Sequence, residues 1–373
     1  MIGEGRGKSM SDPAGQLKEW TGEARLPELV QHHYGIQIQE VQPVGGVLRL
    51  DSDQGVFALK RVRVREELRW KWIRELADFL PDSGEGILTG PIRSRGGGVT
   101  VSGHHQRYVL LPWIPGEIRD LREEGGWEAT ARALAEFHVS TQGFAPSRSA
   151  ASGWIHTGHW RRIWRDLARQ VDMFKLAANL NGDPSPVDQL WSRQCAYAEG
   201  MLETADRYFE KLGGDQTVVA TRKGGEVCHC NIHRRNLIWV AEGRVQLIDW
   251  NRAVLDVRSR DLARLILYSY GRTGSCEPTT MILKAYQEIA PLEEVEYALI
   301  YAQLLFPHRV LRSLQRIYQE QKIPRHLAKG HLSSVMETED RKEGLLQEFP
   351  RLVQRDFHVS IPRVDWLEQK ISV

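Results

Sequence analysis

Two polar side chains near the middle of the chain have the types and the spacing to hold a metal ion. Asn236 stands just before one short apolar run, Leu237–Val240, and Asp249 stands just after a second, Val245–Ile248. Because a turn containing Gly243 separates the runs, they predict a β-hairpin whose open end brings the two side chains together. A carboxylate beside an amide oxygen suits Mg²⁺, which commonly binds protein through one or two carboxylates plus substrate phosphates. A capped hairpin without any ligand is the alternative interpretation.

A polar loop precedes the hairpin and reads Cys228-His229-Cys230-Asn231-Ile232-His233. Its sulfur and imidazole groups are of types that bind zinc. Structural zinc sites, however, usually space their cysteines by about two to four residues, and neighbouring side chains here would point in different directions, so no zinc site is predicted. The amide of Asn231 can hydrogen-bond a substrate hydroxyl, although it cannot accept the proton of that hydroxyl at neutral pH.

The first residues contain a glycine-rich segment, Gly3–Ser9, that looks like a phosphate-binding loop. Its first glycine lies too close to the Gly-Lys-Ser group, and no strand precedes it to aim its amides at a phosphate. We interpret residues 1–24 as a flexible leader.

The composition is that of a globular protein with an ordinary charge balance. The 373 residues include 50 Lys and Arg against 48 Asp and Glu, a formal net charge of +2, which argues against a dedicated nucleic-acid-binding protein. Four cysteines are too few for a disulfide framework, and the polar first residues lack the apolar stretch of a secretory signal. No apolar run approaches the roughly 18 residues of a membrane span. We expect synthesis and folding in the cytoplasm.

Hydrophobic periodicity predicts a β-rich first part and a helical second part. The predicted strands are at 35–44, 47–50, 56–62, 99–102 and 107–112, with helices at 27–34 and 66–80. Further helices are predicted at 128–140, 160–180 and 187–212, and a break at Pro307 within 292–321. We therefore predict an α+β protein of two unequal lobes, a β-rich one at 25–112 and a helical one at 113–373 with a catalytic-type loop at 228–263.

These motifs resemble the catalytic segment of the aminoglycoside phosphotransferase-like kinases, a family built on the protein-kinase fold. In that family a His-x-Asp-(x)4-Asn loop precedes a hairpin, an Ile-Asp-Trp motif and a later Asp-Leu-Ala. The corresponding residues are His229-Cys230-Asn231, Asn236, Ile248-Asp249-Trp250, Asp261-Leu262-Ala263 and, on an earlier helix, Leu134–His138. The resemblance implies a protein-kinase-like two-lobed fold over most of residues 30–350.

Within this superfamily the sequence is similar to the bacterial spore coat protein S/I family. The similarity lies in Gly158-His159-Trp160, which opens a helical insert, and in Tyr108–Gly116. It implies a role in the spore coat or its assembly, with deposition there after synthesis. The implied partners are a nucleotide together with coat proteins or a hydroxyl-bearing acceptor.

The resemblance also implies roles for residues of the first lobe. Lys60 occupies the position of the lysine on the third strand that holds the α- and β-phosphates of ATP. Glu75 on the following helix is its expected partner, with Glu66 and Glu67 as alternatives. The hinge, whose backbone meets the adenine edge, is implied at Pro112, Trp113 and Ile114.

The implied cofactors are ATP and Mg²⁺, with Asn236 and Asp249 as the metal ligands. We expect Lys60 and Asp249 to face each other across one crevice. His229 and Asp261 are expected to brace the loop by hydrogen bonds rather than to take part in chemistry.

The sequence departs from the family at the catalytic position, where Asn231 replaces an aspartate. General-base help is typically worth about 10²–10⁴-fold, whereas positioning and metal electrostatics carry much of phosphoryl transfer. We therefore expect nucleotide binding with impaired or lost phosphotransfer. His233 is a candidate substitute base.

Two other functions stay open. An active kinase would phosphorylate a hydroxyl of a sugar, an amino alcohol or an aminoglycoside-like acceptor, and a pure scaffold would bind no nucleotide. Asp256 is a candidate contact for a cationic acceptor, although a solvated loop residue is the favoured interpretation. Trp160, Trp164 and Trp191 fall on apolar helix faces and are predicted to be core.

Overall fold

The computed structural model describes residues 13–63, 66–80, 88–147, 153–180, 182–221 and 226–369. The glycine-rich segment Gly3–Ser9 lies outside these residues, and its interpretation stays a prediction. The chain divides into two compact units. The first, here called the small lobe, comprises Met1–Glu117 with Ala145–Ser152, and the second, the large lobe, comprises Ile118–Phe144 with Gly153–Val373.

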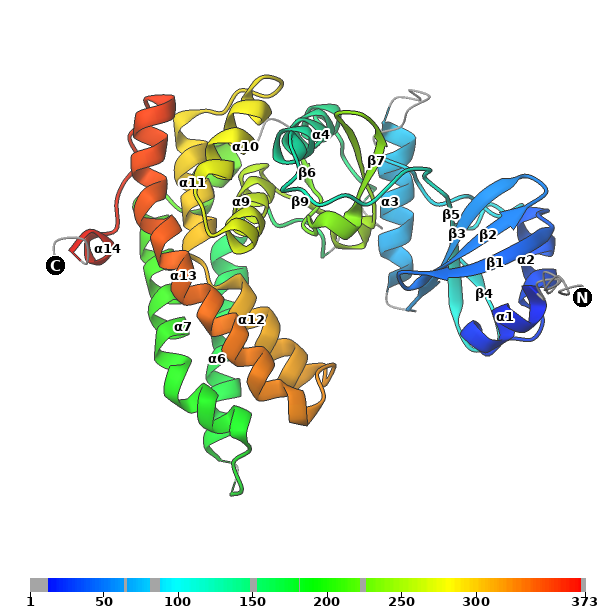
Figure 1. Cartoon of the computed structure of the whole chain (residues 1–373), viewed down its shortest axis with the longest axis horizontal. Helices are drawn as coiled ribbons and strands as arrows, with labels where there is room; N and C mark the ends of the chain where they lie inside the picture. Colours follow the sequence, from blue (N-terminus) through cyan, green and yellow to red (C-terminus); the bar gives the residue numbers. More distant parts are fainter. Residues whose placement is uncertain are drawn as a thin grey trace, which may run out of the picture. The chain divides into compact units, whose positions relative to one another are not determined.

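The small lobe is built on a five-stranded antiparallel sheet in the order β1-β2-β3-β5-β4 (Figure 1). The elements are β1 (Ile38–Val44), β2 (Val47–Ser52), β3 (Gly55–Val62), helix α3 (Glu67–Phe79), β4 (Val101–Ser102) and β5 (Arg107–Pro112). Gly45 and Gly46 form the two-residue turn between β1 and β2 with φ angles of 56° and 94°, which glycine adopts without a steric penalty. The predicted order of three strands, one helix and two strands is confirmed.

The core of the small lobe lies between the sheet and two N-terminal helices. Leu26, Val30 and Tyr34 are spaced by four residues, so they share one face of α2 (Leu26–Tyr34) and pack into the buried cluster. Leu48 and Leu50, which alternate along β2, and Val41 of β1 supply the other side of that cluster.

The flexible leader predicted for residues 1–24 was wrong for its second half. Pro13–Thr21 forms helix α1, and Leu17 is fully buried in the small-lobe core. Trp20 adds a second anchor, since the guanidinium of Arg61 on β3 lies 4.1 Å from the centre of its ring. The sequence pattern did not predict this helix, because only a narrow face of it is apolar and the residues before it are rich in glycine and charge.

The carboxylate of Glu23 fastens the N-terminal segment to the β4–β5 hairpin. Glu23 is buried, and it accepts hydrogen bonds from the Tyr108 hydroxyl at 2.9 Å and from the backbone N–H groups of His104, His105 and Gln106 at 3.1 to 3.3 Å. Burial on its own would raise the pKa of Glu23, but the hydrogen bonds from Tyr108 and these amides lower that pKa below its usual value of 4.5. The ionised carboxylate therefore ties together segments that are far apart in sequence.

The large lobe is mostly helical (Figure 1). Its helices are α4 (Gly126–Ser140), α6 (Trp160–Asn179), α7 (Pro186–Lys211), α8 (Asp215–Thr221), α9 (Ser259–Thr273), α10 (Glu277–Gln287), α11 (Glu294–Leu305), α12 (His308–Leu314), α13 (Arg325–Phe357) and α14 (Asp365–Gln369). The break predicted at Pro307 separates α11 from α12, because proline lacks the N–H that would continue the helix. The pairs α6–α7 and α12–α13 pack side by side.

The tryptophans predicted to be core are buried. Trp160 and Trp191 are fully buried, and Trp164 is nearly so. The rings of Trp160 and Trp164 have their centres 5.9 Å apart, and Trp164 stacks on Phe306 with a centre-to-centre distance of 4.6 Å. Such aromatic pairs stabilise a fold by about 0.5–1.5 kcal/mol beyond the burial of their area.

No helix in the described part of the chain is both long and apolar enough to cross a bilayer.

We predict that Glu23→Gln lowers the free energy of unfolding at neutral pH by about 2 kcal/mol, because the new amide group points a donor at N–H groups that need an acceptor. Urea unfolding followed by circular dichroism measures this. Glu40→Gln, on an exposed position of β1, is the matched control. Since the folded-state pKa of Glu23 is lowered, its contribution is present above pH 4.5 and is lost as the pH falls through the folded-state value. Equal stability of both variants at neutral pH would contradict the anchoring role.

Candidate functional site

The predicted catalytic loop lies between two short antiparallel strand pairs of the large lobe. The strand β6 (Val227–Cys228) pairs with β9 (Val254–Leu255), and β7 (Leu237–Ala241) pairs with β8 (Arg244–Leu247). The hairpin predicted from the apolar runs is β7–β8. The N–H of Ile248 donates to the carbonyl oxygen of Asn236 at 3.0 Å and closes the open end of that hairpin.

A buried carboxylate holds the start of the loop. Asp261 of α9 is fully buried, and its two oxygens accept hydrogen bonds from the backbone N–H groups of His229 at 2.5 Å and Cys230 at 2.8 Å. The Nε2 atom of His138 lies 3.4 Å from the same carboxylate, and its Nδ1 atom lies 2.8 Å from the Tyr286 hydroxyl. Burial opposes the charge of Asp261, but the bond with His138 and the loop amides hold its pKa below the usual value. The expected bracing role of Asp261 is confirmed.

His229 connects the loop to the end of the hairpin. Its Nε2 atom donates to the carbonyl oxygen of Ile248 at 2.9 Å, and its Nδ1 atom accepts from the N–H of Asn231 at 3.2 Å. These two bonds require the neutral ring, and burial lowers the pKa of His229 accordingly. Both ring nitrogens serve the structure, which confirms the role expected for this residue.

Two residues beside the site have left-handed backbone. Cys230 has a φ of 60° and Asp249 has a φ of 67°, in a region that non-glycine residues rarely adopt. Each such residue costs of the order of 1 kcal/mol and persists only where its surroundings hold it, as Asp261 holds the amide of Cys230.

Three of the predicted site residues meet at the end of the hairpin. The Nδ2 atom of Asn231 donates to Oδ2 of Asp249 at 3.3 Å, and Nδ2 of Asn236 donates to the carbonyl oxygen of Asn231 at 2.8 Å. Asn236 is buried, whereas Asn231 and Asp249 are half-buried. Because the amide nitrogens donate within this group, the amide oxygens are the atoms of these side chains left to act as acceptors.

Lys60 lies on β3 of the small lobe, opposite Val109 of β5. Its Nζ atom is 5.5 Å from the centre of the Trp70 ring on α3. Glu75, on the same helix, accepts hydrogen bonds from the N–H of Ser147 at 3.0 Å and from its hydroxyl at 2.6 Å. The pairing of Lys60 with Glu75 stays a prediction. Sequence reasoning missed Ser147, because a partner 72 positions away has no local signal.

The alternative glutamates have other neighbours. Glu66 accepts a hydrogen bond from the N–H of Arg63 at 3.1 Å. Glu67 forms ion pairs with Lys71 and Arg107.

The hinge residues lie at the end of β5 and are half-buried. Pro112 is the last residue of the strand, and the N–H of Trp113 donates to the carbonyl oxygen of Val56 at 3.0 Å. The guanidinium of Arg49 lies 5.5 Å from the centre of the Trp113 ring. The adenine contact expected for Pro112, Trp113 and Ile114 stays a prediction.

A buried group of metal-ligand types lies next to the loop, and it differs from the loop's own Cys and His set. His138, Cys228 and Asp261 have ligand-type atoms within 4.8 Å of one another. The Sγ atom of Cys228 donates to the carbonyl oxygen of Val257 at 3.2 Å, and burial raises the pKa of this thiol well above its usual value. Since metals bind the thiolate, this protonated thiol is better explained as part of the support beneath the loop.

Both interpretations of Asp256 were wrong. Asp256 is fully buried, where it accepts two hydrogen bonds from Nε1 of Trp160 at 2.8 and 2.9 Å and pairs with Arg260. It is therefore neither a solvated loop residue nor a contact for an acceptor. Its partner Arg260 lies in the first turn of α9, four residues later, and the composition of the loop alone did not indicate this pair.

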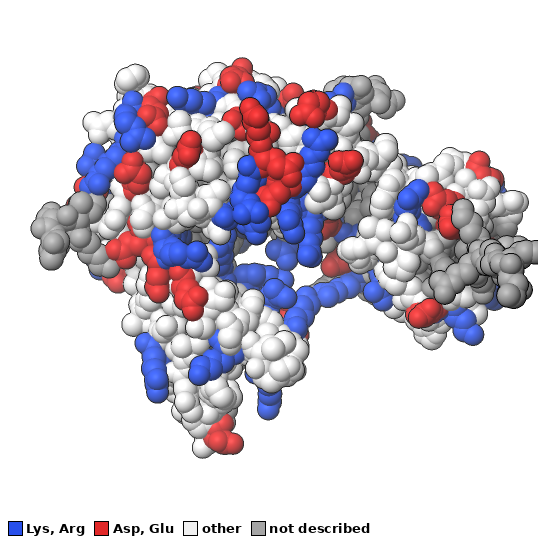
Figure 2. All heavy atoms as spheres, in the orientation of Figure 1, with Lys and Arg blue, Asp and Glu red and all other residues white. Residues whose placement is uncertain are grey.

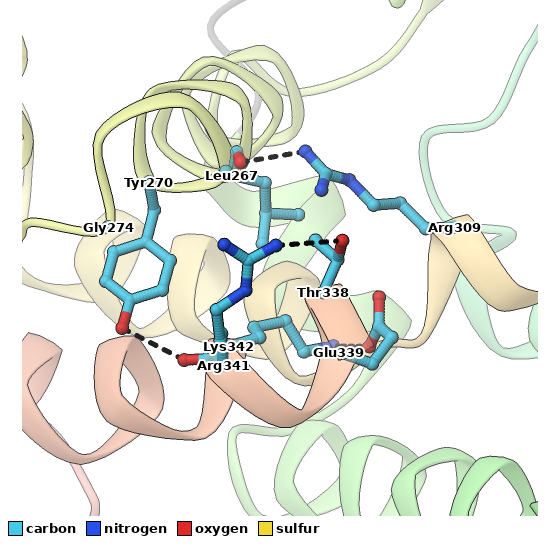
Figure 3. Close-up of a pocket in the computed structure, with 9 residues that line it drawn as sticks. Leu267, Tyr270, Gly274, Arg309, Thr338, Glu339, Arg341 and Lys342 are labelled. Carbon is cyan, nitrogen blue, oxygen red and sulfur yellow. Dashed lines mark hydrogen bonds and ion pairs between the residues drawn. The ribbon is translucent and has the colours of Figure 1, made fainter. Parts of the chain in front are cut away.

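A separate cavity of about 140 Å³ lies among α9, α12 and α13 (Figure 3). Its charged side chains are engaged by protein groups: Lys342 pairs with Glu339 at 2.6 Å, and Arg309 donates to the carbonyl oxygen of Leu267 at 3.0 Å. It contains none of the predicted catalytic residues.

Comparison with known families places the loop and hairpin in context. A family model described as "Spore coat putative kinase YutH" matches residues 27–349, which is most of the chain. The chain belongs to this spore coat kinase family. The match extends across both lobes and includes Lys60, Asn231, Asn236 and Asp249, so it spans all the elements that carry the predicted site.

Relatives and solved structures agree with this family and with the kinase-like fold. Spore coat protein S of Bacillus subtilis (strain 168) is 21% identical over 318 residues, covering 83% of this chain and 88% of the relative. An aminoglycoside phosphotransferase from Alicyclobacillus acidocaldarius superposes with a TM-score of 0.68 at 18% identity, covering 88% of this chain and 96% of the other. Spectinomycin phosphotransferase in complex with ADP and spectinomycin gives a TM-score of 0.57 at 18% identity, covering 86% and 98%. The fold is therefore the predicted α+β, protein-kinase-like, two-lobed one.

We predict that Asp261→Asn lowers the free energy of unfolding of the large lobe by about 3 kcal/mol. Each oxygen of Asp261 accepts one backbone N–H, whereas asparagine has a single acceptor oxygen, so one of these N–H groups would face an NH2 donor. Thermal or urea unfolding measures the change. Asp166→Asn, an exposed carboxylate on α6, is the control and should stay within about 0.5 kcal/mol of the native chain. If Asp261→Asn were as stable as that control, the bracing role would be rejected.

Proposed function

We propose that this spore coat kinase-family chain binds Mg·ATP and that its phosphotransfer is impaired or lost because Asn231 stands where the family has its catalytic aspartate. The observation that supports this most is the hydrogen bond from Asn231 to Asp249. It keeps the loop side chain beside the expected metal ligand while removing the group that would accept a proton.

The residues of the large lobe fit a hard divalent cation. Asp249 offers a carboxylate and Asn236 an amide oxygen, and hydrogen bonds within the loop bring the two residues together through Asn231. Oxygen donors of this kind suit Mg²⁺, which bridges and neutralises the phosphates of a bound nucleotide. Asn236 and Asp249 would hold the ion, and Lys60 would contact the α- and β-phosphates.

The support for a nucleotide comes from the fold relatives. One solved relative was studied in complex with ADP, and another structure of it contains AMP. The hinge segment from Pro112 to Ile114 begins at the last residue of β5, the strand that pairs with the Lys60 strand, which suits an adenine contact beside the lysine.

Asn231 can orient an acceptor hydroxyl but cannot take its proton. Its Nδ2 atom is used by Asp249, so Oδ1 is the atom left to accept a hydrogen bond from the hydroxyl. Positioning would survive, whereas general-base help, typically about 10²–10⁴-fold, would be lost. The proposed outcome is a nucleotide-binding pseudokinase, deposited in the spore coat and acting on coat proteins as a structural or regulatory partner.

An active small-molecule kinase is the second candidate, and His233 is the observation that favours it. Burial lowers the pKa of His233, and Arg235 and Arg252 lower it further against the attraction of Asp249. The imidazole is therefore neutral at pH 7 and able to accept a proton. A sugar, amino alcohol or aminoglycoside-like hydroxyl would then be the acceptor.

We predict that the native chain binds Mg·ATP and that Lys60→Ala weakens this binding about tenfold or more, because one charge-assisted phosphate contact is lost. Asp249→Ala should remove the dependence of binding on Mg²⁺. Isothermal titration calorimetry measures both effects.

Lys71→Ala, an exposed lysine of α3, is the matched control for Lys60→Ala and should bind like the native chain. Absence of Mg·ATP binding to folded native protein would reject the nucleotide proposal and favour a scaffold.

We predict that Asn231→Asp raises ATP-dependent phosphotransfer by about 10²–10⁴-fold, since it restores a proton acceptor. The new carboxylate replaces an amide that donates to Asp249, so the variant should be less heat-stable than native protein without Mg²⁺ and should recover with it. A coupled assay of ADP release with a panel of hydroxyl acceptors measures the rate.

Robust native turnover that His233→Ala abolishes and Asn231→Asp leaves unchanged would instead establish the active kinase.

A further inference from the structure

Three arginines of the large lobe, Arg252, Arg264 and Arg312, are close enough for the charges of the other two to act on Arg252, as Asp249 also does. Arg252 ends the turn η3 (Trp250–Arg252), directly after Asp249, Arg264 lies in α9 and Arg312 lies in the last turn of α12. Figure 2 shows basic side chains gathered around the hollow beside α9 and α12. Sequence reasoning did not single out these residues, because they come from three separate elements.

Hydrogen bonds hold these three elements at one place. Asp249, which precedes η3, is bonded to Asn231 of the loop, and the loop is bonded through its Cys230 amide to Asp261 of α9. On the other side, Arg309 of α12 donates to the carbonyl oxygen of Leu267 of α9 at 3.0 Å. The catalytic loop, α9 and α12 therefore form one connected structure.

The arginines act on one another electrostatically. Desolvation first, and then the positive charges of Arg312 and Arg264, lower the pKa of Arg252 against the attraction of Asp249 and Glu320. The Arg252 side chain is nevertheless exposed. Because Arg252 is exposed, a ligand can reach it.

Two of the three guanidinium groups are not neutralised by the protein. In the part of the chain that the structure describes, Arg252 and Arg264 form no ion pair. The Nε atom of Arg264 is buried and has no hydrogen-bond partner there. A buried donor without an acceptor is unfavourable, so an incoming anion would relieve it.

The nearby carboxylates are already engaged. Glu320 accepts from Lys322 at 2.8 Å and from Arg312 at 2.7 Å, and these contacts lower its pKa to about 2. Asp249 is the metal ligand of the proposed function. The charge that remains beside the loop is therefore positive, and Arg235 adds to it, since its charge lowers the pKa of His233.

A rare backbone feature follows directly after Arg312. Residues Gln315–Gln319 form a π-helical turn, η4, which holds Arg316. Such turns occur frequently at functional sites, since they widen a helix and redirect its side chains.

We propose that Arg252, Arg264 and Arg312 bind an anionic group, a phosphate or a carboxylate, of the hydroxyl compound that approaches Asn231. The inference rests on the proposed function for the identity of this compound as the acceptor. Arginine forks match phosphate and carboxylate oxygens in pairs, whereas the cationic groups of an amino alcohol or an aminoglycoside would be repelled. The acceptor class is therefore an anionic hydroxyl compound, such as a sugar phosphate or a hydroxy acid.

The test is a calorimetric titration of the full chain with matched probes: glucose 6-phosphate, glucose, glycerate, glycerol and choline. The native chain should bind glucose 6-phosphate or glycerate at least about tenfold more tightly than the neutral member of its pair, and more weakly as salt is added. The stronger of the two anions identifies the phosphate or the carboxylate as the recognised group. Choline should not bind.

Arg252→Gln should weaken binding of the anion about tenfold or more, and it leaves the fold intact because the side chain is exposed and forms no ion pair with the residues that the structure describes. Arg264→Gln and Arg312→Gln should act in the same direction. Arg169→Gln, an exposed arginine of α6, is the matched control and should bind like the native chain. Circular dichroism and thermal unfolding confirm that each variant is folded.

The inference is overturned if the native chain binds neither anion, if Arg252→Gln binds like Arg169→Gln, or if choline binds more tightly than the anions. It is also overturned if saturating Mg·AMP-PNP displaces the anion, because the arginines would then serve the nucleotide. Lys60→Ala should keep anion binding, so a chain that binds the anion but no Mg·ATP would refute the proposed function and leave the arginine site standing.

Discussion

The buried carboxylate of Asp261 is the constraint on which the site depends. It accepts the amides of His229 and Cys230 directly, with His138 and Tyr286 behind it, and so holds a loop whose next residue is Asn231. The left-handed backbone of Cys230 would not persist without such a partner. A buried charge in this position is stable because the two loop amides donate to it and His138 contacts it, and these bonds hold the loop backbone in place.

In a kinase, the catalytic loop usually supplies two things, the orientation of the ligands and the transfer of a proton, and here the two are separated. The orientation of Asn231 and Asp249 depends on the loop, the hairpin and Asp261, all of which are present. Proton transfer depends on the chemistry of one side chain, and Asn231 lacks it. Under the proposed function, such a chain would keep the shape needed to hold a nucleotide, and the arginines beside the loop would favour an anionic compound next to it.

Local patterns in the sequence predicted much of the fold. The turn at Gly45-Gly46, the strands of the small lobe, the break at Pro307 and the β7–β8 hairpin each arise from residues close together in the chain, and all are observed. The bracing role of His229 and Asp261 was also predictable, because the spacing of their motifs matches a known family.

The remaining features depend on partners distant in sequence. Helix α1 is attached by Leu17 and Trp20 to a core made elsewhere, and Glu23 accepts from amides 81 or more positions away. Asp256 looked solvated until its bonds with Trp160 and Arg260 were seen. Arg252, Arg264 and Arg312 likewise come from three separate elements, and they come together only when the loop, α9 and α12 have packed. Contacts between charged or apolar residues that are distant in sequence cannot be predicted from the pattern of neighbouring residues.

The most direct test of the central claim is a crystal structure of the chain with Mg·AMP-PNP. The account predicts one nucleotide whose Mg²⁺ is bound by the carboxylate of Asp249 and the amide oxygen of Asn236, and whose α- and β-phosphates contact the Lys60 ammonium. A nucleotide bound away from these groups, or one that contacts Asp249 while Lys60 contacts none of its phosphates, would contradict it.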